Sequence, residues 1–154
     1  MDCYITGTGS YLPGDAINNE DISKYIGKLE GESEIKEKIL RMNGIKQRHY
    51  ALDRHQDPTH DVYELAALAV EDCLNNCGYK GSIGYLSTGT TNAPLVAPGL
   101  ASVVHSRLAE MGILQESIEI NSNSGICTSA AQAIINACRV VWLGEQASVL
   151  SVGV

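Results

Sequence analysis

One cysteine in this sequence stands where nucleophilic chemistry is feasible. Cys127 lies between a run of small polar residues, 121–125, and a long apolar segment that begins near Ala130. The Asn, Ser and Gly residues predict a turn, and the apolar spacing that follows predicts a helix. At a helix N-terminus, free backbone N–H groups and the positive end of the helix dipole favour a thiolate over a thiol. A thiolate on a tight turn beside a sheet is a nucleophile.

The position of Cys127 also fits a plainer interpretation. Free cysteine is among the residue types most often buried, and many such cysteines only fill space in a core. Cys73 and Cys77 show the same choice, since they stand four residues apart in a predicted helix and are half of a possible metal site. Structural zinc needs four ligands. We interpret this pair as core packing and expect no metal.

A glycine-rich turn near the N-terminus is a second candidate for binding chemistry. Gly7 and Gly9 follow a β-rich run, as in dinucleotide-binding turns. Leu12 stands where that fingerprint has its third glycine, and Pro13 opposes entry into a helix. The alternative is that the two glycines let the backbone pass close to a neighbouring element, and we favour it.

Length and composition exclude several classes of protein. The chain has 154 residues, 44% hydrophobic and 19% charged, which is typical of a soluble domain with its own core. The net charge of −7 and the scattered Lys and Arg argue against a nucleic-acid partner. We see no apolar run of membrane-spanning length and no signal-peptide pattern, so we expect a cytosolic protein without a membrane partner. Five cysteines, an odd number, fit reduced thiols there.

Predicted strands and helices alternate along the chain. Strands are predicted at 3–8, 45–50, 83–87, 118–120 and 147–154. Helices are predicted at about 19–26, 32–42, 61–77, 98–111 and 130–142. This alternation predicts an α/β layered fold with a five-stranded, mostly parallel sheet and helices on both faces. Ligands bind beyond the carboxyl ends of such strands, where the predicted loops 88–92 and 121–127 leave the sheet.

Four stretches, in order, resemble β-ketoacyl synthase III, the thiolase-fold condensing enzymes that start fatty-acid and polyketide chains. Residues 4–13 (YITGTGSYLP) resemble the family's opening, 43–49 (NGIKQRH) its "TGI..RH" segment, and 89–98 its "ATTS…P" loop. Cys127 falls where the family has its active-site cysteine, and a strand ending near "VGV" follows. The resemblance covers nearly the whole chain and implies that residues 1–154 are one N-terminal thiolase-like domain.

The resemblance implies acyl transfer. Cys127 takes an acyl group from an acyl-coenzyme A or an acyl carrier protein, and the acyl enzyme condenses with malonyl carrier protein with loss of carbon dioxide. Substrate contacts are implied for Arg41, Thr90, Asn92 and Ala97. No cofactor is implied beyond these substrates.

Two positions depart from the family pattern. The family's arginine that clasps the adenine of coenzyme A corresponds to Met42, with Arg41 beside it, and no tryptophan stands nearby. A carrier-protein acyl donor is therefore a reasonable substitute for coenzyme A. Ala97 stands where the family commonly has a phenylalanine that closes the acyl tunnel of the partner subunit, and this chain has no phenylalanine. We expect acceptance of acyl groups longer than acetyl.

The resemblance also places the family's catalytic histidine and asparagine in a second half of the fold, which we expect to lie outside this chain. The four histidines do not align with the catalytic one: His49, His55, His60 and His105. We therefore expect a homodimer or a partner chain that supplies the missing half, and an inactive chain in isolation. Two hypotheses follow: an acyltransferase within a larger active unit, or a non-catalytic half-fold subunit that assembles with another condensing-enzyme chain.

Overall fold

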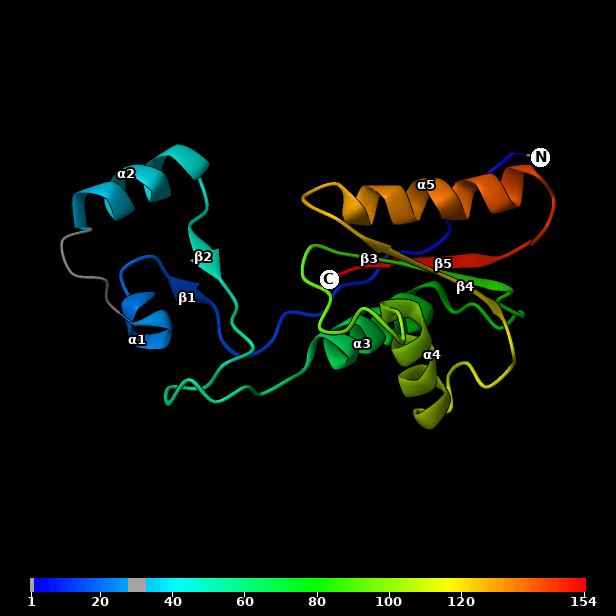
Figure 1. Ribbon diagram of the computed structural model, residues 1–154, viewed down its shortest axis with the longest axis horizontal. Coiled ribbons are helices and arrows are strands. Elements are labelled where there is room, and N and C mark those ends of the chain that lie inside the picture. Colours follow the sequence, from blue (N-terminus) through cyan, green and yellow to red (C-terminus); the bar gives the residue numbers. More distant parts are fainter. Residues whose placement is uncertain (1, 28–32) are drawn as a thin grey trace. The chain divides into compact units, whose positions relative to one another are not determined.

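The computed structural model describes residues 2–27 and 33–154, which form two compact units. Unit 1 comprises Met1–Tyr11 and Val62–Val154, and unit 2 comprises Leu12–Asp61. The elements of unit 1 are α3 (Val62–Cys77), β3 (Tyr85–Thr90), α4 (Leu100–Glu110), β4 (Glu119–Ser124), α5 (Ser129–Trp142) and β5 (Val149–Gly153) (Figure 1). Those of unit 2 are β1 (Ile17–Asn18), α1 (Ser23–Ile26), α2 (Ser33–Asn43) and β2 (Gln47–Arg48).

Unit 1 is built on a parallel sheet of three strands in the order β4-β3-β5. Figure 1 shows α5 on one face of this sheet and α3 and α4 on the other. The predicted α/β layered class, with helices on both faces, is confirmed. Both faces of β5 carry apolar residues that pack in the interior. Leu150 and Val152 belong to the core between the sheet and the α3–α4 layer, and Val149 packs against α5.

The main apolar core lies between the sheet and the α3–α4 layer. Leu86 of β3 and both Val104 and Leu108 of α4 are fully buried there. Val104 and Leu108 are four residues apart and so lie on one face of the helix. Each buried Val or Leu side chain contributes roughly 1.5–3 kcal/mol to stability. This core holds the sheet whose carboxyl end carries the candidate site.

The sheet differs from the predicted one in its number of strands. Residues 3–8 are extended but form no strand, and the predicted strand at 45–50 shortens to β2, which pairs with β1 in unit 2. The N-terminal segment forms no strand because it packs against α3 instead of pairing with the sheet. A Cβ on Gly9 would lie 2.7 Å from the carbonyl oxygen of Ala69, inside α3. The backbone N–H of Ser10 donates to Asp72 of the same helix at 2.9 Å.

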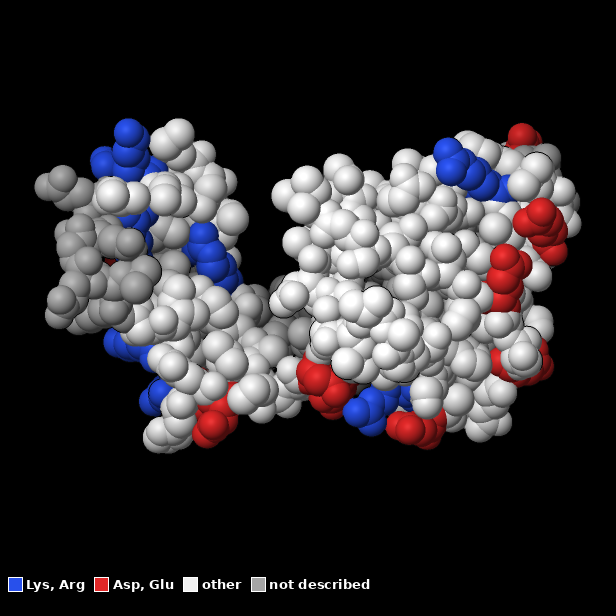
Figure 2. Space-filling model, in the orientation of Figure 1, with Lys and Arg blue, Asp and Glu red and all other residues white. Residues whose placement is uncertain are grey.

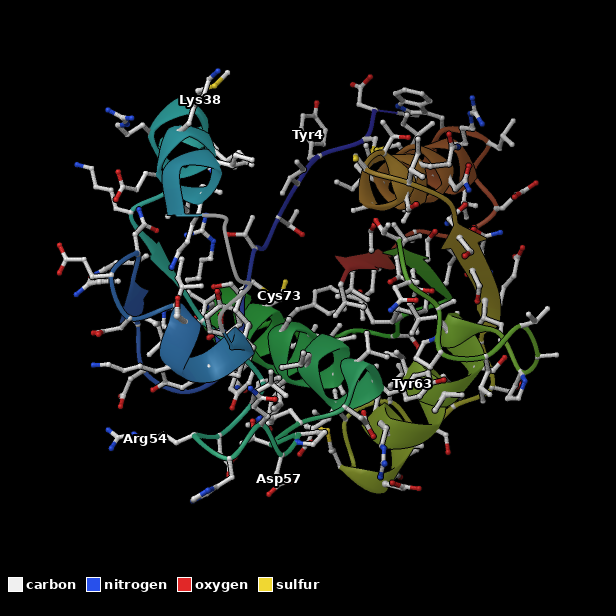
Figure 3. All side chains as sticks on the ribbon, turned by 60° about the vertical axis from the view of Figure 1, so that its left-hand side comes forward. Tyr4, Lys38, Arg54, Asp57, Tyr63 and Cys73 are labelled. Carbon is white, nitrogen blue, oxygen red and sulfur yellow. The ribbon has the colours of Figure 1, made fainter. Side chains whose placement is uncertain are left out.

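The two N-terminal glycines thus let the backbone pass close to α3, which is the alternative favoured from the sequence. A Cβ on Gly7 would lie 3.0 Å from the Cys77 sulfur and 3.3 Å from the Cys73 sulfur. Figure 3 shows Cys73 on α3. The pair of cysteines is half-buried and packs against this segment rather than within the apolar core that was expected. Among the described residues, no group of three or more His, Cys, Asp or Glu side chains is arranged to hold a metal ion.

Strands β3 and β4 extend further than predicted. Thr88 and Thr90 were expected in a loop but pair in register with Ser122 and Ser124 of β4. Small polar residues favour a turn when they have no strand partner. Here β3 and β4 pair with each other through backbone hydrogen bonds, so their polar ends continue as strand. The predicted helix at 19–26 also shortens to α1, because residues 19–22 form a turn in which the N–H of Asp21 donates to the carbonyl oxygen of Asn18 at 3.0 Å. The three helices of unit 1 begin and end within two residues of the predicted bounds.

Unit 2 is held by side-chain hydrogen bonds around its two-stranded pair. Asn19 donates from Nδ2 to the carbonyl oxygen of Ile45 at 2.9 Å and accepts at Oδ1 from Arg48 at 2.6 Å. The rings of Tyr25 and Tyr50 stack with centroids 5.8 Å apart. In the part of the chain that the structure describes, no helix is both long and apolar enough to cross a membrane.

Candidate active site

Cys127 lies in the turn between β4 and α5, as predicted, and it is exposed. The turn spans residues 125–128, with Thr128 at the N-cap position of α5. Because β4 is parallel to β3 and β5, the turn leaves from the carboxyl end of the sheet. That end is where ligands bind in open α/β sheets. The catalytic role of Cys127 stays a prediction at this point.

Backbone and hydroxyl hydrogen bonds hold the two ends of this turn. The N–H of Gly125 donates to the carbonyl oxygen of Thr90 at 3.3 Å, which fastens the start of the turn to β3. The N–H and Oγ of Ser129 both donate to the carbonyl oxygen of Ile126, at 2.9 and 2.7 Å. Cys127 therefore sits on a turn whose two flanks are fixed.

Two glycines let the first turn of α5 lie directly on the strand ends. A Cβ on Gly89 of β3 would lie 2.7 Å from the backbone nitrogen of Ala130. A Cβ on Gly153 of β5 would overlap the Cβ of the same alanine. Contacts this short with backbone atoms leave no room for a side chain. The glycines thus place the start of α5, and the turn before it, over the carboxyl end of the sheet.

The start of α5 is suited to an anion. The side chain of Thr128 makes no capping hydrogen bond to the helix. The first N–H groups of a helix have no partner within it, and they carry part of the positive helix dipole. A thiolate or a developing oxyanion beside this turn is stabilised by that field.

The other cysteines meet a different environment. Cys3, Cys73, Cys77 and Cys138 are half-buried, whereas Cys127 is exposed. Burial raises the pKa of the Cys73 thiol, and the neighbouring Cys77 and Asp72 add to the effect. Burial also raises the pKa of the Cys138 thiol, with a further contribution from Cys3. These two thiols are disfavoured as nucleophiles at neutral pH.

This chain is similar in sequence to proteins named β-ketoacyl-[acyl-carrier-protein] synthase III. β-Ketoacyl-[acyl-carrier-protein] synthase III of Xanthomonas oryzae pv. oryzae is 30% identical over 149 residues, which are 97% of this chain and 41% of that protein. The protein of the same name from Ehrlichia canis is 27% identical over 150 residues, 97% of this chain and 42% of its own. The chain is related to the β-ketoacyl synthase III enzymes over nearly all of its length. It spans 41% of the length of the first of these relatives, and no protein-family model matches it.

Solved structures show the same fold. β-Ketoacyl synthase III from Thermus thermophilus superposes with a TM-score of 0.71 at 24% identity, covering 98% of this chain and 42% of that one. The synthase from Aquifex aeolicus superposes with a TM-score of 0.66 at 22% identity, covering 92% and 41%. The synthase III-like chain therefore has one part of the thiolase-like fold.

Two further predicted site residues, Thr90 and Asn92, lie at the same end of the sheet as the Cys127 turn. Thr90 is the last residue of β3, is buried, and contacts the turn through its carbonyl oxygen. Its hydroxyl oxygen accepts from the backbone N–H of Asn92 at 3.2 Å. Ala97 is exposed in the loop that follows, before a cis peptide bond to Pro98.

Arg41 belongs to unit 2, and the structure does not join it to Cys127. With Asn19, Glu37 and Leu40 it lines a hollow of about 320 Å³ beside α2. Two of the four histidines, His49 and His105, contact backbone carbonyl oxygens. The Nδ1 of His49 lies 3.1 Å from the carbonyl oxygen of Gly14, and the Nε2 of His105 lies 2.9 Å from that of Glu116.

The sequence reasoning missed a cluster of amide side chains between β4 and α5. Asn121 and Asn123 were assigned to a turn, and Asn136 was overlooked within an apolar helix. The signal was present in the sequence. Asn121 and Asn123 alternate as residues on one face of a strand do, and Asn136 is a lone amide among the apolar residues of α5.

Proposed function

We propose that this chain carries the acyl-accepting part of an acyltransferase of the 3-oxoacyl-carrier-protein synthase III type, with Cys127 as the nucleophile. One observation carries the proposal. The only exposed cysteine of the described residues stands on the β4–α5 turn, before a helix start that its N-cap residue leaves uncapped. The relationship to β-ketoacyl synthase III supports the reaction class.

The first step is a thioester exchange. The Cys127 thiolate attacks the carbonyl carbon of an acyl-coenzyme A or an acyl carrier protein. The carbon–sulfur bond of the donor breaks, the donor thiol leaves, and the acyl group is bound to Cys127 as a thioester. Helix N–H groups near the turn stabilise the oxyanion of the tetrahedral intermediate.

The second step needs groups that we propose lie outside residues 1–154. Malonyl carrier protein loses carbon dioxide, and the resulting carbanion attacks the acyl thioester. A 3-oxoacyl carrier protein forms and the Cys127 thiol is released. We propose that this chain is the N-terminal half of the fold, and that a homodimer or a partner chain supplies the histidine and asparagine of the other half. We propose that this reaction belongs to fatty-acid or polyketide-like biosynthesis in the cytosol.

Substrate contacts are part of the same proposal. Thr90 and Asn92 border the carboxyl end of the sheet where the acyl carbonyl arrives. Ala97 borders the end of the acyl tunnel of the partner subunit. Arg41, in its hollow beside α2, contacts the phosphate or adenine part of the donor.

Acylation tests the function directly. The purified chain is incubated with an acyl-coenzyme A or an acyl carrier protein, and its intact mass and peptides are measured. We expect one acyl group, bound to Cys127 and released by hydroxylamine. Cys127→Ser removes it, and Cys138→Ser, at a half-buried cysteine of α5, retains it.

A chain that takes no acyl group from either donor contradicts the enzyme hypothesis. It favours the other one, a non-catalytic half-fold subunit that assembles with another condensing-enzyme chain.

A further inference from the structure

A polar row crosses the sheet beneath α5, where an apolar layer is the usual arrangement. In register, Ser87 of β3 lies opposite Asn121 of β4 on one side and Ser151 of β5 on the other. Ser87 is fully buried. The hydroxyl of Ser151 is buried too, and no hydrogen-bond partner for it is found among the described residues. Directional polar contacts therefore replace part of the apolar packing between sheet and helix.

Asn136 is the contribution of α5 to this polar layer. Its Nδ2 donates to Asn123 Oδ1 at 2.9 Å and to Asn121 Oδ1 at 3.2 Å. Its Oδ1 accepts from Gln132 Nε2 at 2.9 Å, one turn earlier on the helix. One side chain of α5 thus reaches two positions on β4.

Asn123 passes this connection on to the central strand. Its Nδ2 donates to the carbonyl oxygen of Thr88 at 2.8 Å and to Asn121 Oδ1 at 2.8 Å. The same nitrogen lies 3.3 Å from the hydroxyl oxygen of Ser87. The helix, the edge strand and the central strand are therefore joined through side-chain amides.

We propose that Asn136 is a positioning residue for Cys127, and the inference rests on the proposed function. The turn that carries Cys127 starts where β4 ends and stops where α5 begins. The hydrogen bond from Asn136 to Asn123 joins those two elements directly. It fixes the position of the helix along the strand, and so the span that the turn must bridge.

Apolar packing alone does not fix that position. The buried residues of α5 beside Asn136 are Ala133, Ala137 and Val140, and apolar contacts of this kind are non-directional. They set how closely the helix packs on the sheet, but they do not pair a given residue of α5 with a given residue of β4. The half-buried hydrogen bonds from Asn136 to Asn121 and Asn123 are directional, and directional bonds favour one arrangement of helix and strand.

The test compares two reactions of Cys127 that differ in their need for orientation. Alkylation by iodoacetamide needs only an accessible thiolate, whereas acyl transfer also needs a fixed angle of attack. In Asn136→Leu, which keeps volume but removes the amide, we expect acyl transfer to fall about tenfold or more. Iodoacetamide labelling should stay within about twofold of the parent chain, since the thiol stays exposed. Asn75→Leu, the same change at an exposed position of α3, should alter neither rate.

Hydrogen exchange supplies a readout that needs no acyl donor. We expect the amides of Gly125 and Ser129, which donate the hydrogen bonds at the two ends of the turn, to exchange about tenfold faster in Asn136→Leu, because local opening controls the exchange of hydrogen-bonded amides. Amides of α3 and α4 should keep their parent rates. Unchanged exchange at Gly125 and Ser129, or equal losses of acyl transfer and alkylation, overturns the proposal.

The outcomes separate this inference from the proposed function. A parent chain that takes no acyl group defeats the function, and exchange at Gly125 and Ser129 then decides the role of Asn136 alone. Asn136→Ala, which avoids overpacking, covers the case in which the leucine variant does not fold, and Asn136→Gln should recover part of the lost acyl transfer. Unfolding of both apolar variants assigns Asn136 to holding the fold and overturns the proposal.

Discussion

Cys127 differs from the other cysteines in its exposure, which leads to a prediction about reactivity. Limiting iodoacetamide at pH 7 should label Cys127 first, since it alone is exposed beside a helix start. Burial raises the pKa values of Cys73 and Cys138, so their thiols stay protonated at pH 7 and gain reactivity only as the pH rises further. Peptide mapping across a pH series measures the order. Preferential labelling of Cys73 or Cys138 at neutral pH would remove Cys127 as the nucleophile.

Ala97 carries a prediction about acyl chain length. In the proposed function, Ala97 puts a methyl group where the resemblance implies a phenyl ring at the end of the partner's acyl tunnel. Each further methylene buried in the space left there would add about 0.8 kcal/mol of binding. In the complete enzyme, with its other half present, Cys127 should accept longer donors better than acetyl. Acylation rates compared from acetyl to decanoyl donors measure this. Ala97→Phe is the matched variant and should shift the preference toward short donors, whereas a clear preference for acetyl in the parent enzyme would contradict the prediction.

The position of Cys127 was predictable from the sequence, and the role of Asn136 was not. The turn residues before Cys127 and the apolar helix after it are local signals, so position followed from neighbours alone. Asn136 gains its meaning only from Asn121 and Asn123, and that contact depends on how α5 lies on β4. Periodicity shows which residues share a face of one element, but it does not show which residue of a helix will contact which residue of a strand.

At the scale of elements, the helices were predicted well because their signal is periodic and local. α3, α4 and α5 have apolar residues at helical spacing, and their bounds match closely. Strand bounds failed where small polar residues form the ladder, as in the second half of β4. The N-terminal run was predicted as a strand from its composition, yet its glycines bring it onto α3 instead. Pairing partners are non-local, and a single sequence does not specify them.

Gly89 provides a test of how closely α5 approaches the sheet. Gly89→Ala adds a methyl group 2.7 Å from the backbone nitrogen of Ala130, so the start of the helix must move. Overpacking of this kind costs about 1–3 kcal/mol, and we expect the free energy of unfolding to fall by that amount in urea denaturation. Gly125→Ala is the matched control, because its nearest contact is the hydroxyl oxygen of Ser129 at 3.2 Å, the end of a side chain. Equal free energies of unfolding for the two variants would show that α5 does not pack closely on Gly89.

At the scale of the whole chain, large apolar residues remain exposed around the helix that carries the site. Ile134 is 50% exposed, Trp142 57% and Leu143 73%. In the view of Figure 2, the face of unit 1 is mostly uncharged, with its carboxylates toward the lower and right margins. Soluble monomers rarely expose contiguous apolar surface beyond a few hundred Å². This surface is consistent with a larger assembly, in which another half or another chain covers α5.

The same surface predicts how the purified chain behaves. In the described sheet, β4 and β5 are both outermost strands, and an unpaired strand edge is a template for association with another chain. We expect self-association in light scattering and binding of a hydrophobic dye. The double substitution Ile134→Ser and Ile135→Ser removes two exposed apolar side chains of α5 and should reduce dye binding. It leaves the strand edges and the exposed Trp142 and Leu143 intact, so any association that persists in this variant occurs through those groups. A monodisperse parent chain that binds no dye would contradict the prediction.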